Sequence, residues 1–378
     1  MTNPLQDLAT AGQSIWLDYM HRKLMDDGEL KRLVEEDAVT GVTSNPSIFE
    51  KAIGEGADYD DRIKAALLES DTNTMDLYER VAIQDIQAAA DVLKPVWDRT
   101  QGRDGYVSLE VSPYLALETD DTIREGERLW KAVGRPNLMI KVPGTKEGTP
   151  AIAALIGQGI NVNVTLLFAV DAYLGVAKAH LQGLDYLKAH GGDVSKVHGV
   201  ASFFVSRIDS KIDKEIDRRV GEGDAHADEL KSLRGKVAIA NAKVAYQKYQ
   251  EMIGSERWKA LAADGAAPQR LLWASTGTKD PAYSDVLYVE SLIGPDTVNT
   301  MPTKTLEAFK DHGKVAPTLA DGLEEARKVI EAQERLGLDL KGVTDILVTE
   351  GVSSFSHSFD TLLGAVASKR TQILGKAA

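Results

Sequence analysis

The chain has 378 residues, of which 43% are hydrophobic and 27% are charged, as in an ordinary soluble globular protein. Its 44 basic and 57 acidic residues give a formal net charge of −13. This acidic surface argues against nonspecific nucleic-acid binding and against docking on anionic membranes. The sequence contains no cysteine, which excludes disulfides, thiolate catalysis and cysteine-ligated metals.

We expect neither a membrane-spanning helix nor a signal peptide. No apolar run approaches the ~18 residues that a membrane-spanning helix needs. The first residues, Met1 to Asp18, have neither the basic nor the continuous apolar region of a signal peptide. We therefore expect a cytoplasmic protein that does not associate with membranes.

Short β-like runs alternate with helical patterns along most of the chain. We expect strands near 14–20, 40–45, 106–112, 137–143, 160–167, 198–205, 270–275 and 297–302. Amphipathic patterns lie between them at 59–69, 75–94, 121–133, 169–189, 206–220 and 229–251. Eight strands separated by helices predict an α/β fold, a (β/α)8 TIM barrel with additional helices. A doubly wound open sheet is the alternative, but no Gly-x-Gly-x-x-Gly turn follows the first strand, which weakens a dinucleotide-binding version.

The domain organisation follows from the spacing of these elements. No internal repeat, low-complexity tract or linker divides the chain, so we expect one TIM-barrel domain over 1–378. Two segments, near 46–105 and near 208–269, exceed the usual spacing between strands and indicate helical insertions. The stretch 317–372 indicates further helices at the C-terminal end.

Polar residues recur on one face of several predicted strands. In the run 160–167, Asn161, Asn163 and Thr165 alternate with apolar residues. The same alternation sets Asp18, Thr43, Asn45, Ser108, Glu110, Lys141, Ser202 and Phe204 on the corresponding faces of other strands. A single such strand would fit an ordinary antiparallel sheet facing water. Six of them between helices fit better with side chains that converge at the mouth of a barrel, because burying charges without partners costs several kcal/mol each.

Lys141 stands out because Ile140 and Val142 flank it on an apolar strand. Desolvation favours a neutral amine, which can attack carbonyl groups. The alternatives are a lysine that reaches the barrel mouth or one that simply pairs with Glu110.

Three motifs resemble those of the transaldolase family, in that family's order: Gly41–Ser47 (GVTSNPS), Ile140–Thr145 (IKVPGT) and Ile160–Phe168 (INVNVTLLF). The resemblance runs from about Trp16 to Pro302. It implies a class I aldolase-type barrel, which agrees with the strand pattern. It also implies transfer of a dihydroxyacetone unit from sedoheptulose 7-phosphate or fructose 6-phosphate to glyceraldehyde 3-phosphate or erythrose 4-phosphate, in the pentose phosphate pathway.

The resemblance further assigns roles to residues that match the motifs. Lys141 resembles the Schiff-base lysine, Asp18 the acid/base for the C4 hydroxyl, and Glu110 with Thr165 the pair that holds a water. The residues expected to bind substrate are Thr43, Asn45, Asn163, Ser202, Phe204, Arg207, Ser275 and Lys279. Among these, Ser202 and Arg207 resemble phosphate contacts, and Phe204 resembles an aromatic wall. No cofactor and no metal are implied.

One segment departs from the family pattern. Many transaldolases have a Ser-Phe-Arg triplet at the seventh strand, whereas this chain has Ser275 followed by Thr276, Gly277, Thr278 and Lys279. Backbone amides near Gly277, the Thr278 hydroxyl and Lys279 could bind the phosphate instead. A plain turn with a solvated lysine is the alternative.

Other functions stay open at this point. A different Schiff-base aldolase could release dihydroxyacetone, and a barrel with a vestigial site could serve as a binding module. The complete set of matching polar residues disfavours the binding module. His180, His190 and His198 lack a metal-binding pattern and indicate packing or surface roles. A homo-oligomer is compatible with the sequence.

Overall fold

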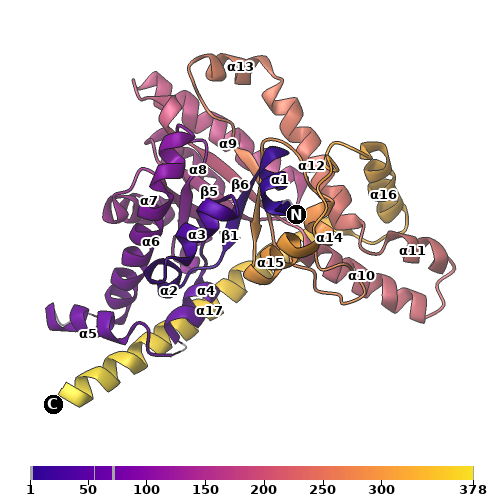
Figure 1. Cartoon of the computed structure of the whole chain (residues 1–378). Helices are drawn as coiled ribbons and strands as arrows, with labels where there is room; N and C mark the ends of the chain where they lie inside the picture. The colour runs from indigo at the N-terminus through magenta and orange to yellow at the C-terminus, as the bar shows by residue number, and fades with distance from the viewer. Residues whose placement is uncertain (1–2, 55, 70–72, 378) are drawn as a thin grey trace.

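The computed structural model describes residues 3–54, 56–69 and 73–377, so residues 1–2, 55, 70–72 and 378 of the expected 1–378 domain lie outside it. Eight parallel strands, paired in sequence order, close into a barrel. The strands are β1 (Gln13–Asp18), β2 (Val39–Thr43), β3 (Tyr106–Glu110), β4 (Leu138–Pro143), β5 (Val162–Leu167), β6 (Gly199–Phe204), β7 (Arg270–Ala274) and β8 (Thr297–Met301). Helices surround this barrel on the outside (Figure 1). The predicted fold class is confirmed, and every strand boundary lies within two residues of the expected one.

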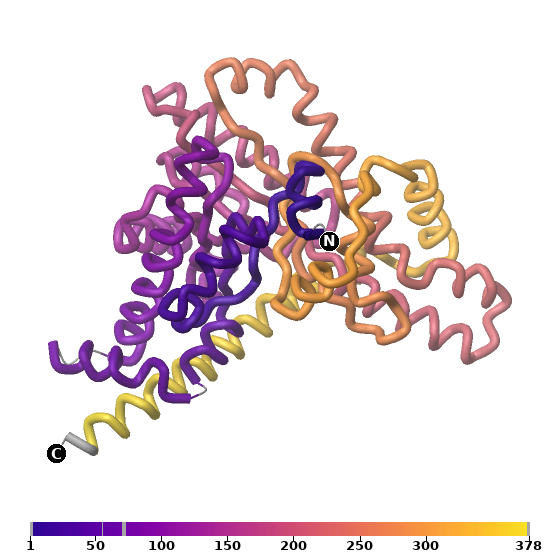
Figure 2. The backbone as a smooth tube through the Cα atoms, in the orientation of Figure 1, coloured from indigo at the N-terminus to yellow at the C-terminus, as the bar shows by residue number. Residues whose placement is uncertain are grey.

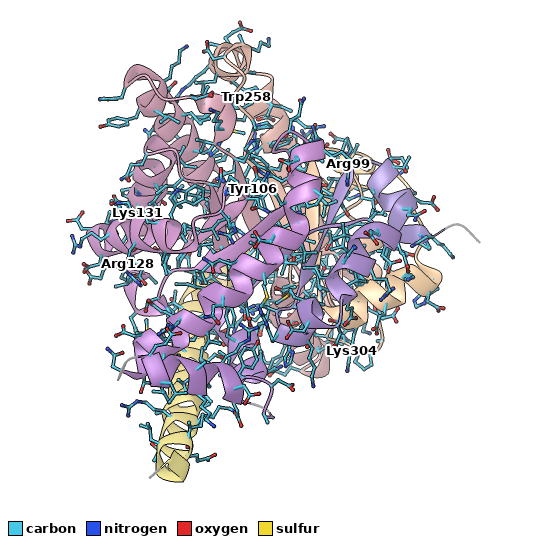
Figure 3. The ribbon with its side chains drawn as sticks, turned by 60° about the vertical axis from the view of Figure 1, so that its left-hand side comes forward. Arg99, Tyr106, Arg128, Lys131, Trp258 and Lys304 are labelled. Atoms are coloured by element: carbon cyan, nitrogen blue, oxygen red, sulfur yellow. The ribbon has the colours of Figure 1, made fainter. Side chains whose placement is uncertain are left out.

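Helices connect the strands and cover the barrel. In the first half of the chain they are α1 (Pro4–Thr10), α2 (Arg22–Asp26), α3 (Glu29–Glu36), α4 (Pro46–Gly54), α5 (Asp60–Glu69), α6 (Thr74–Arg99), α7 (Thr119–Val133), α8 (Gly148–Gly157) and α9 (Val170–Ala189). In the second half they are α10 (Ser206–Gly221), α11 (Ala227–Leu233), α12 (Val237–Ile253), α13 (Glu256–Ala263), α14 (Leu287–Glu290), α15 (Thr303–His312), α16 (Leu323–Arg335) and α17 (Leu340–Ala377). Arg128 and Lys131 of α7 lie on the outer surface of this layer, away from the barrel (Figure 3).

The two long connections both consist of helices. Between β2 and β3 the chain forms α4, α5 and α6, and between β6 and β7 it forms α10 to α13. Two expected helices are wrong in their bounds. The pattern at 75–94 continues to Arg99 in α6. The pattern at 229–251 is divided into α11 and α12, because Gly235 adopts a left-handed φ of +67° between them. The backbone N–H of Gly235 donates to Asp213 of α10, which ties this break to the neighbouring helix.

The barrel interior is filled by side chains rather than open. Trp16 of β1 is completely buried, and its indole N–H donates to Asp104 over 2.7 Å. Gly41 on the neighbouring strand makes room for this ring, since a Cβ at that position would lie 2.5 Å from the indole atoms. At the end where the strands begin, Arg270 of β7 donates a 2.7 Å hydrogen bond to Ser14. In barrels of this kind the chemistry takes place at the other end, where the strands finish.

The expected alternation fails at one position in β5. Strict alternation would place Leu166 on the same face as Val162 and Val164, but it has a left-handed φ of +60° and the pairing with β6 shifts between Val164 and Leu167. The irregularity turns the Leu166 side chain toward α17, where a Cβ on Gly351 would lie only 2.7 Å from Leu166 Cδ2. An isolated non-glycine residue in this conformation costs on the order of 1 kcal/mol, and such sites cluster near active centres. Here it directly follows Thr165.

The last helix is much longer than the others. α17 contacts β5, α10, α4 and α5 in turn, so it passes over the C-terminal ends of the strands and then continues beyond the barrel. Figure 2 shows it as the yellow tube that extends to the C-terminal end beside the purple α4 and α5 segments. Gly351, Phe355, Phe359 and Leu362 form its buried stripe, at spacings of four, four and three residues. Among the described helices, none combines the length and apolar character that crossing a membrane requires.

Candidate active site

A polar cavity of about 140 Å³ lies at the C-terminal mouth of the barrel. Its wall consists of Asp18, Thr43, Asn45, Lys141, Thr165, Ser202, Phe204, Arg207, Ala274, Ser275, Gly277, Lys279, Thr300, Pro302 and Phe355. Ten of the twelve residues that the sequence pointed to are in this wall. The other two, Glu110 and Asn163, are buried neighbours of Lys141 on the adjacent strands β3 and β5. The strands thus bring the predicted residues together from positions far apart in the chain.

Lys141 and Glu110 form the most buried charged pair of the site. The two residues are direct neighbours in the register of β4 and β3, and Lys141 Nζ lies 3.2 Å from Glu110 Oε2. The lysine also donates to the backbone carbonyl of Ser44 over 3.1 Å. Only 5% of Lys141 is exposed, so it does not reach out to bulk solvent. Burial raises the pKa of Glu110, and the lysine cation opposes this shift. The carboxylate can therefore take up the lysine proton at modest cost.

Asp18 lies across the cavity at the end of β1. Its carboxylate accepts a 2.7 Å hydrogen bond from Thr43, its neighbour in the register of β2. Burial raises the pKa of Asp18, whereas the cation of Lys141 and the Thr43 hydrogen bond lower it. A carboxylate with a raised pKa is suited to move protons near neutral pH.

A row of hydrogen-bonded polar side chains runs beside Lys141, because Asn163 is its neighbour in the register of β5. Ser202 Oγ donates to Asn163 Oδ1 over 2.7 Å, and Asn163 Nδ2 donates to Ser108 Oγ over 2.9 Å. Thr165 Oγ1 has no hydrogen-bond partner within the described residues, and neither does the Glu110 carboxylate apart from its ion pair. Buried polar atoms without partners are rare in native proteins, so these groups are available to a substrate or a water.

The cationic side of the cavity is formed by Arg207 and Lys279. Arg207 follows β6 at the start of α10, and its guanidinium carbon lies 5.2 Å from the centre of the Phe204 ring. Burial lowers the pKa of Arg207, and the Asp18 carboxylate opposes this shift. Lys279 is exposed at the rim of the cavity. Two cations at one end of a small polar cavity favour an anionic group there.

The loop after β7 takes a defined shape. Ser275 has a left-handed φ of +55°, and its hydroxyl lies 2.9 Å from that of Ser206. Gly277 belongs to the cavity wall, but the Thr278 hydroxyl does not, because it donates to the carbonyl of Ser284 over 2.8 Å. Of the groups expected in this segment, Ser275, Gly277 and Lys279 therefore face the cavity and Thr278 does not.

The sequence alone did not point to Ala274, Thr300, Pro302 or Phe355. Thr300 lies on β8, where the alternation of polar residues is obscured because Thr297, Asn299 and Thr300 are all polar. Phe355 belongs to α17, and its ring centre lies 5.7 Å from Lys141 Nζ. Four residues further along the same helix, the Phe359 ring packs against Tyr78 of α6. No local feature of this helix marks Phe355 as the ring that reaches the site.

The fold and the cavity define the class of protein. It is a (β/α)8 barrel whose C-terminal mouth holds a buried lysine–carboxylate pair and a cationic end. The sequence profile of the transaldolase/fructose-6-phosphate aldolase family matches residues 15–366. A protein named transaldolase from Trichodesmium erythraeum is 46% identical over 373 residues, which cover 98% of each chain. Transaldolase 2 of a Nostoc species is 47% identical over 97% of each chain. Transaldolase 1 of Streptomyces avermitilis is 47% identical over 99% of this chain and 97% of the relative. The chain belongs to the transaldolase/fructose-6-phosphate aldolase family.

Proposed function

We propose that this chain transfers a dihydroxyacetone unit between sugar phosphates through a Schiff base on Lys141. Transaldolase activity is supported by relatives of that name over nearly the whole chain. The observation that carries the lysine assignment is the position of Lys141 in the cavity wall, buried and 3.2 Å from Glu110. A ketose is a poor substrate for C–C cleavage, but its protonated imine accepts the electron pair that cleavage leaves behind.

Imine formation begins with the neutral Lys141 amine. We infer that Glu110 accepts the lysine proton, because its pKa is raised by burial and its carboxylate lies within reach. The amine then attacks the C2 carbonyl of the ketose, and the resulting carbinolamine loses its oxygen as water. Glu110 and Thr165 are the groups available to hold that water, since both are buried and free to make further hydrogen bonds.

Cleavage requires a base at the C4 hydroxyl. Asp18 lines the same cavity as Lys141, on a different strand. In the proposed step the Asp18 carboxylate takes the hydroxyl proton, the C3–C4 bond breaks, and its electrons form an enamine on the Lys141 nitrogen. The aldose phosphate leaves, a second aldose phosphate binds, and the steps run in reverse. Asn45 and Asn163 are proposed to bind the dihydroxyacetone hydroxyls.

The phosphate is proposed to bind at the cationic end of the cavity. Arg207 is the stronger candidate because it is partly buried against Phe204, whereas Lys279 is exposed. Ser202, Ser275 and the backbone near Gly277 add hydrogen-bonding groups on the same wall. This arrangement supports fructose 6-phosphate and sedoheptulose 7-phosphate as donors, with erythrose 4-phosphate and glyceraldehyde 3-phosphate as acceptors, as in the pentose phosphate pathway.

The second candidate is an aldolase that releases free dihydroxyacetone, since the matched family includes such enzymes. The apolar rings of Phe204 and Phe355 in the cavity wall favour transfer. Neither ring can protonate the enamine, and both reduce the access of water.

We further propose a single-domain cytoplasmic enzyme. The absence of cysteine and the acidic composition are compatible with a reducing compartment. A homo-oligomer is also proposed, and light scattering coupled to gel filtration measures the mass directly.

Borohydride trapping tests the central proposal. The protein is incubated with fructose 6-phosphate, reduced, digested and mapped by mass spectrometry. We expect one adduct, on Lys141, and formation of sedoheptulose 7-phosphate when erythrose 4-phosphate is added without reductant. An adduct on another lysine, or no adduct in an active sample, contradicts the Lys141 mechanism. Release of dihydroxyacetone without transfer supports the aldolase instead.

A further inference from the structure

Three oxygen atoms form a hydrogen-bonded chain that ends at Asp18. Thr43 Oγ1 lies 2.7 Å from Asp18 Oδ1 and also 2.7 Å from Thr300 Oγ1. Thr43 and Thr300 are only 2% and 3% exposed. Both distances are those of well-formed hydroxyl hydrogen bonds, so the three oxygen atoms form a continuous chain.

The direction of this chain follows from counting hydrogen atoms. Each threonine hydroxyl carries one hydrogen. When Asp18 is ionised it can only accept, so the Thr43 hydrogen points to Asp18. Thr43 then has only lone pairs to offer to Thr300, and the Thr300 hydroxyl must donate to Thr43. The two bonds point the same way, and aligned hydrogen bonds polarise and strengthen one another.

Closure of the barrel creates this arrangement. β1 lies between β2 and β8, with Asp18 opposite Thr43 on one side and Trp16 opposite Thr300 on the other. Asp18, Thr43 and Thr300 therefore come from three adjacent strands and meet at the mouth, although the strand register places Thr300 beside Trp16. Thr300 also lines the cavity, so it belongs to the site rather than to the outer layer.

We propose that Thr300 is a positioning residue for the acid/base step: through Thr43 it stabilises and orients the ionised Asp18 carboxylate, and so sets the pH at which C–C cleavage begins. This inference rests on the proposed function, in which Asp18 acts as a base.

Every charged group facing Asp18 comes from another element. Lys141 on β4, Arg207 on α10 and Lys279 after β7 are cations that favour ionised Asp18, and Glu110 on β3 is an acid that opposes it. Burial works against ionisation and raises the pKa of Asp18 overall. Substrate phosphate would neutralise Arg207 and Lys279 when it binds, whereas it leaves the hydroxyl chain intact. The hydroxyl chain is thus a stabilising interaction that persists during cleavage, alongside the cationic imine on Lys141.

The test compares Thr300→Val, which keeps the shape and removes the hydroxyl, with Thr300→Ser, which keeps the hydroxyl. Single-turnover release of glyceraldehyde 3-phosphate from fructose 6-phosphate is measured against pH, without acceptor. We expect the acidic side of the pH–rate profile of Thr300→Val to move to higher pH by about half to one unit. The free energy of one hydrogen bond corresponds to a change of about that size in the pKa of Asp18. Thr300→Ser should keep the wild-type limb. Borohydride trapping on Lys141 should be equal in all three proteins, because imine formation does not use Asp18.

Three results would overturn the inference. The acid limb of Thr300→Val could stay in place, the limb of Thr300→Ser could move equally, or only KM could change, which would make Thr300 a plain substrate contact. Thr300→Ala, checked by circular dichroism, replaces Thr300→Val if the valine variant does not fold. Failure of the proposed function looks different, because the wild-type protein would then give no Lys141 adduct at all.

Discussion

Lys141 Nζ and Glu110 Oε2 lie 3.2 Å apart in the interior of the barrel, and each side chain is more than nine-tenths buried. The two strands that carry them are adjacent and hold them in direct register. A buried ion pair contributes little net stability, but removing one partner leaves the other uncompensated. Any substitution at Lys141 therefore has to be judged against its effect on Glu110.

Lys141→Arg separates chemistry from charge. Arginine keeps a cation beside Glu110, but it does not lose its proton in a protein and cannot form the imine. We expect turnover to fall at least about 1000-fold, as for other lost nucleophiles, with little loss of folded protein. Steady-state transfer assays and thermal melts measure both. Residual activity above a tenth of wild type would contradict the assignment. Lys141→Ala should be equally inactive but less stable, since it leaves Glu110 unpaired.

Asp18→Asn should stop the reaction after imine formation. The amide keeps the shape and still accepts from Thr43, but it cannot take a proton from the C4 hydroxyl. We expect a normal borohydride adduct on Lys141 and a cleavage rate lower by about 100- to 10,000-fold. Rapid quench with fructose 6-phosphate measures the cleavage step. A normal rate would move the base to another residue, with Glu110 the next candidate.

Arg207→Ala should weaken phosphorylated substrates selectively. A charge-assisted contact contributes about 2 kcal/mol or more, so kcat/KM for fructose 6-phosphate should fall about 30-fold or more. Unphosphorylated fructose should lose much less. Equal losses for both sugars would make Arg207 structural. Lys279→Ala is the matched comparison, and its effect should be smaller because that side chain is exposed and screened.

Phe204→Tyr should shift the balance from transfer to release. The Phe204 ring lines the cavity and packs against Phe168, with ring centres 5.2 Å apart. A tyrosine hydroxyl could protonate the enamine directly or order a water that does so. We expect more free dihydroxyacetone from fructose 6-phosphate, relative to transfer to erythrose 4-phosphate. The ratio of the two rates is the measurement, and an unchanged ratio would leave Phe204 with a packing role only.

His180 should make the protein sensitive to acid. It is 1% exposed on α9, and burial lowers its pKa to about 4. Above the ordinary pKa of about 6.5 the histidine is neutral in both the folded and the unfolded chain. Between about pH 6.5 and pH 4 only the unfolded chain binds the proton. The free energy of unfolding therefore decreases as the pH is lowered through this range, by on the order of 3 kcal/mol in total.

Urea unfolding at several pH values tests this expectation. His180→Gln should reduce the slope of the unfolding free energy against pH. The reduction should correspond to at most one proton fewer taken up on unfolding. His357→Gln, at an exposed position of α17, is the control and should leave the slope unchanged. If both variants keep the wild-type slope, another buried group such as His198, whose pKa burial also lowers, accounts for the acid sensitivity.

Much of the site was visible in the alternation of residues along single strands. Asp18, Thr43, Lys141, Thr165, Ser202 and Phe204 lie on inward faces because side-chain direction in a strand has a period of two. Parallel strands covered by helices have no watery face, so such polar residues indicate the barrel mouth. The same rule does not separate every polar residue: Asn161 has the expected parity, yet it donates to the backbone carbonyls of Pro136 and Leu138.

The amino-acid sequence by itself determined the eight strands, their order and most of the groups that converge at their ends, because these depend on local alternation and on motifs within single segments. Only the tertiary structure decided the rest. Barrel closure places Thr300 of β8 against Thr43 of β2, and the path of α17 places Phe355 over Lys141. The turn of Leu166 toward Gly351 likewise depends on that helix. These contacts join segments that are distant in the chain. The periodicity of residues within one segment does not predict them, because they depend on how the strands and helices pack together.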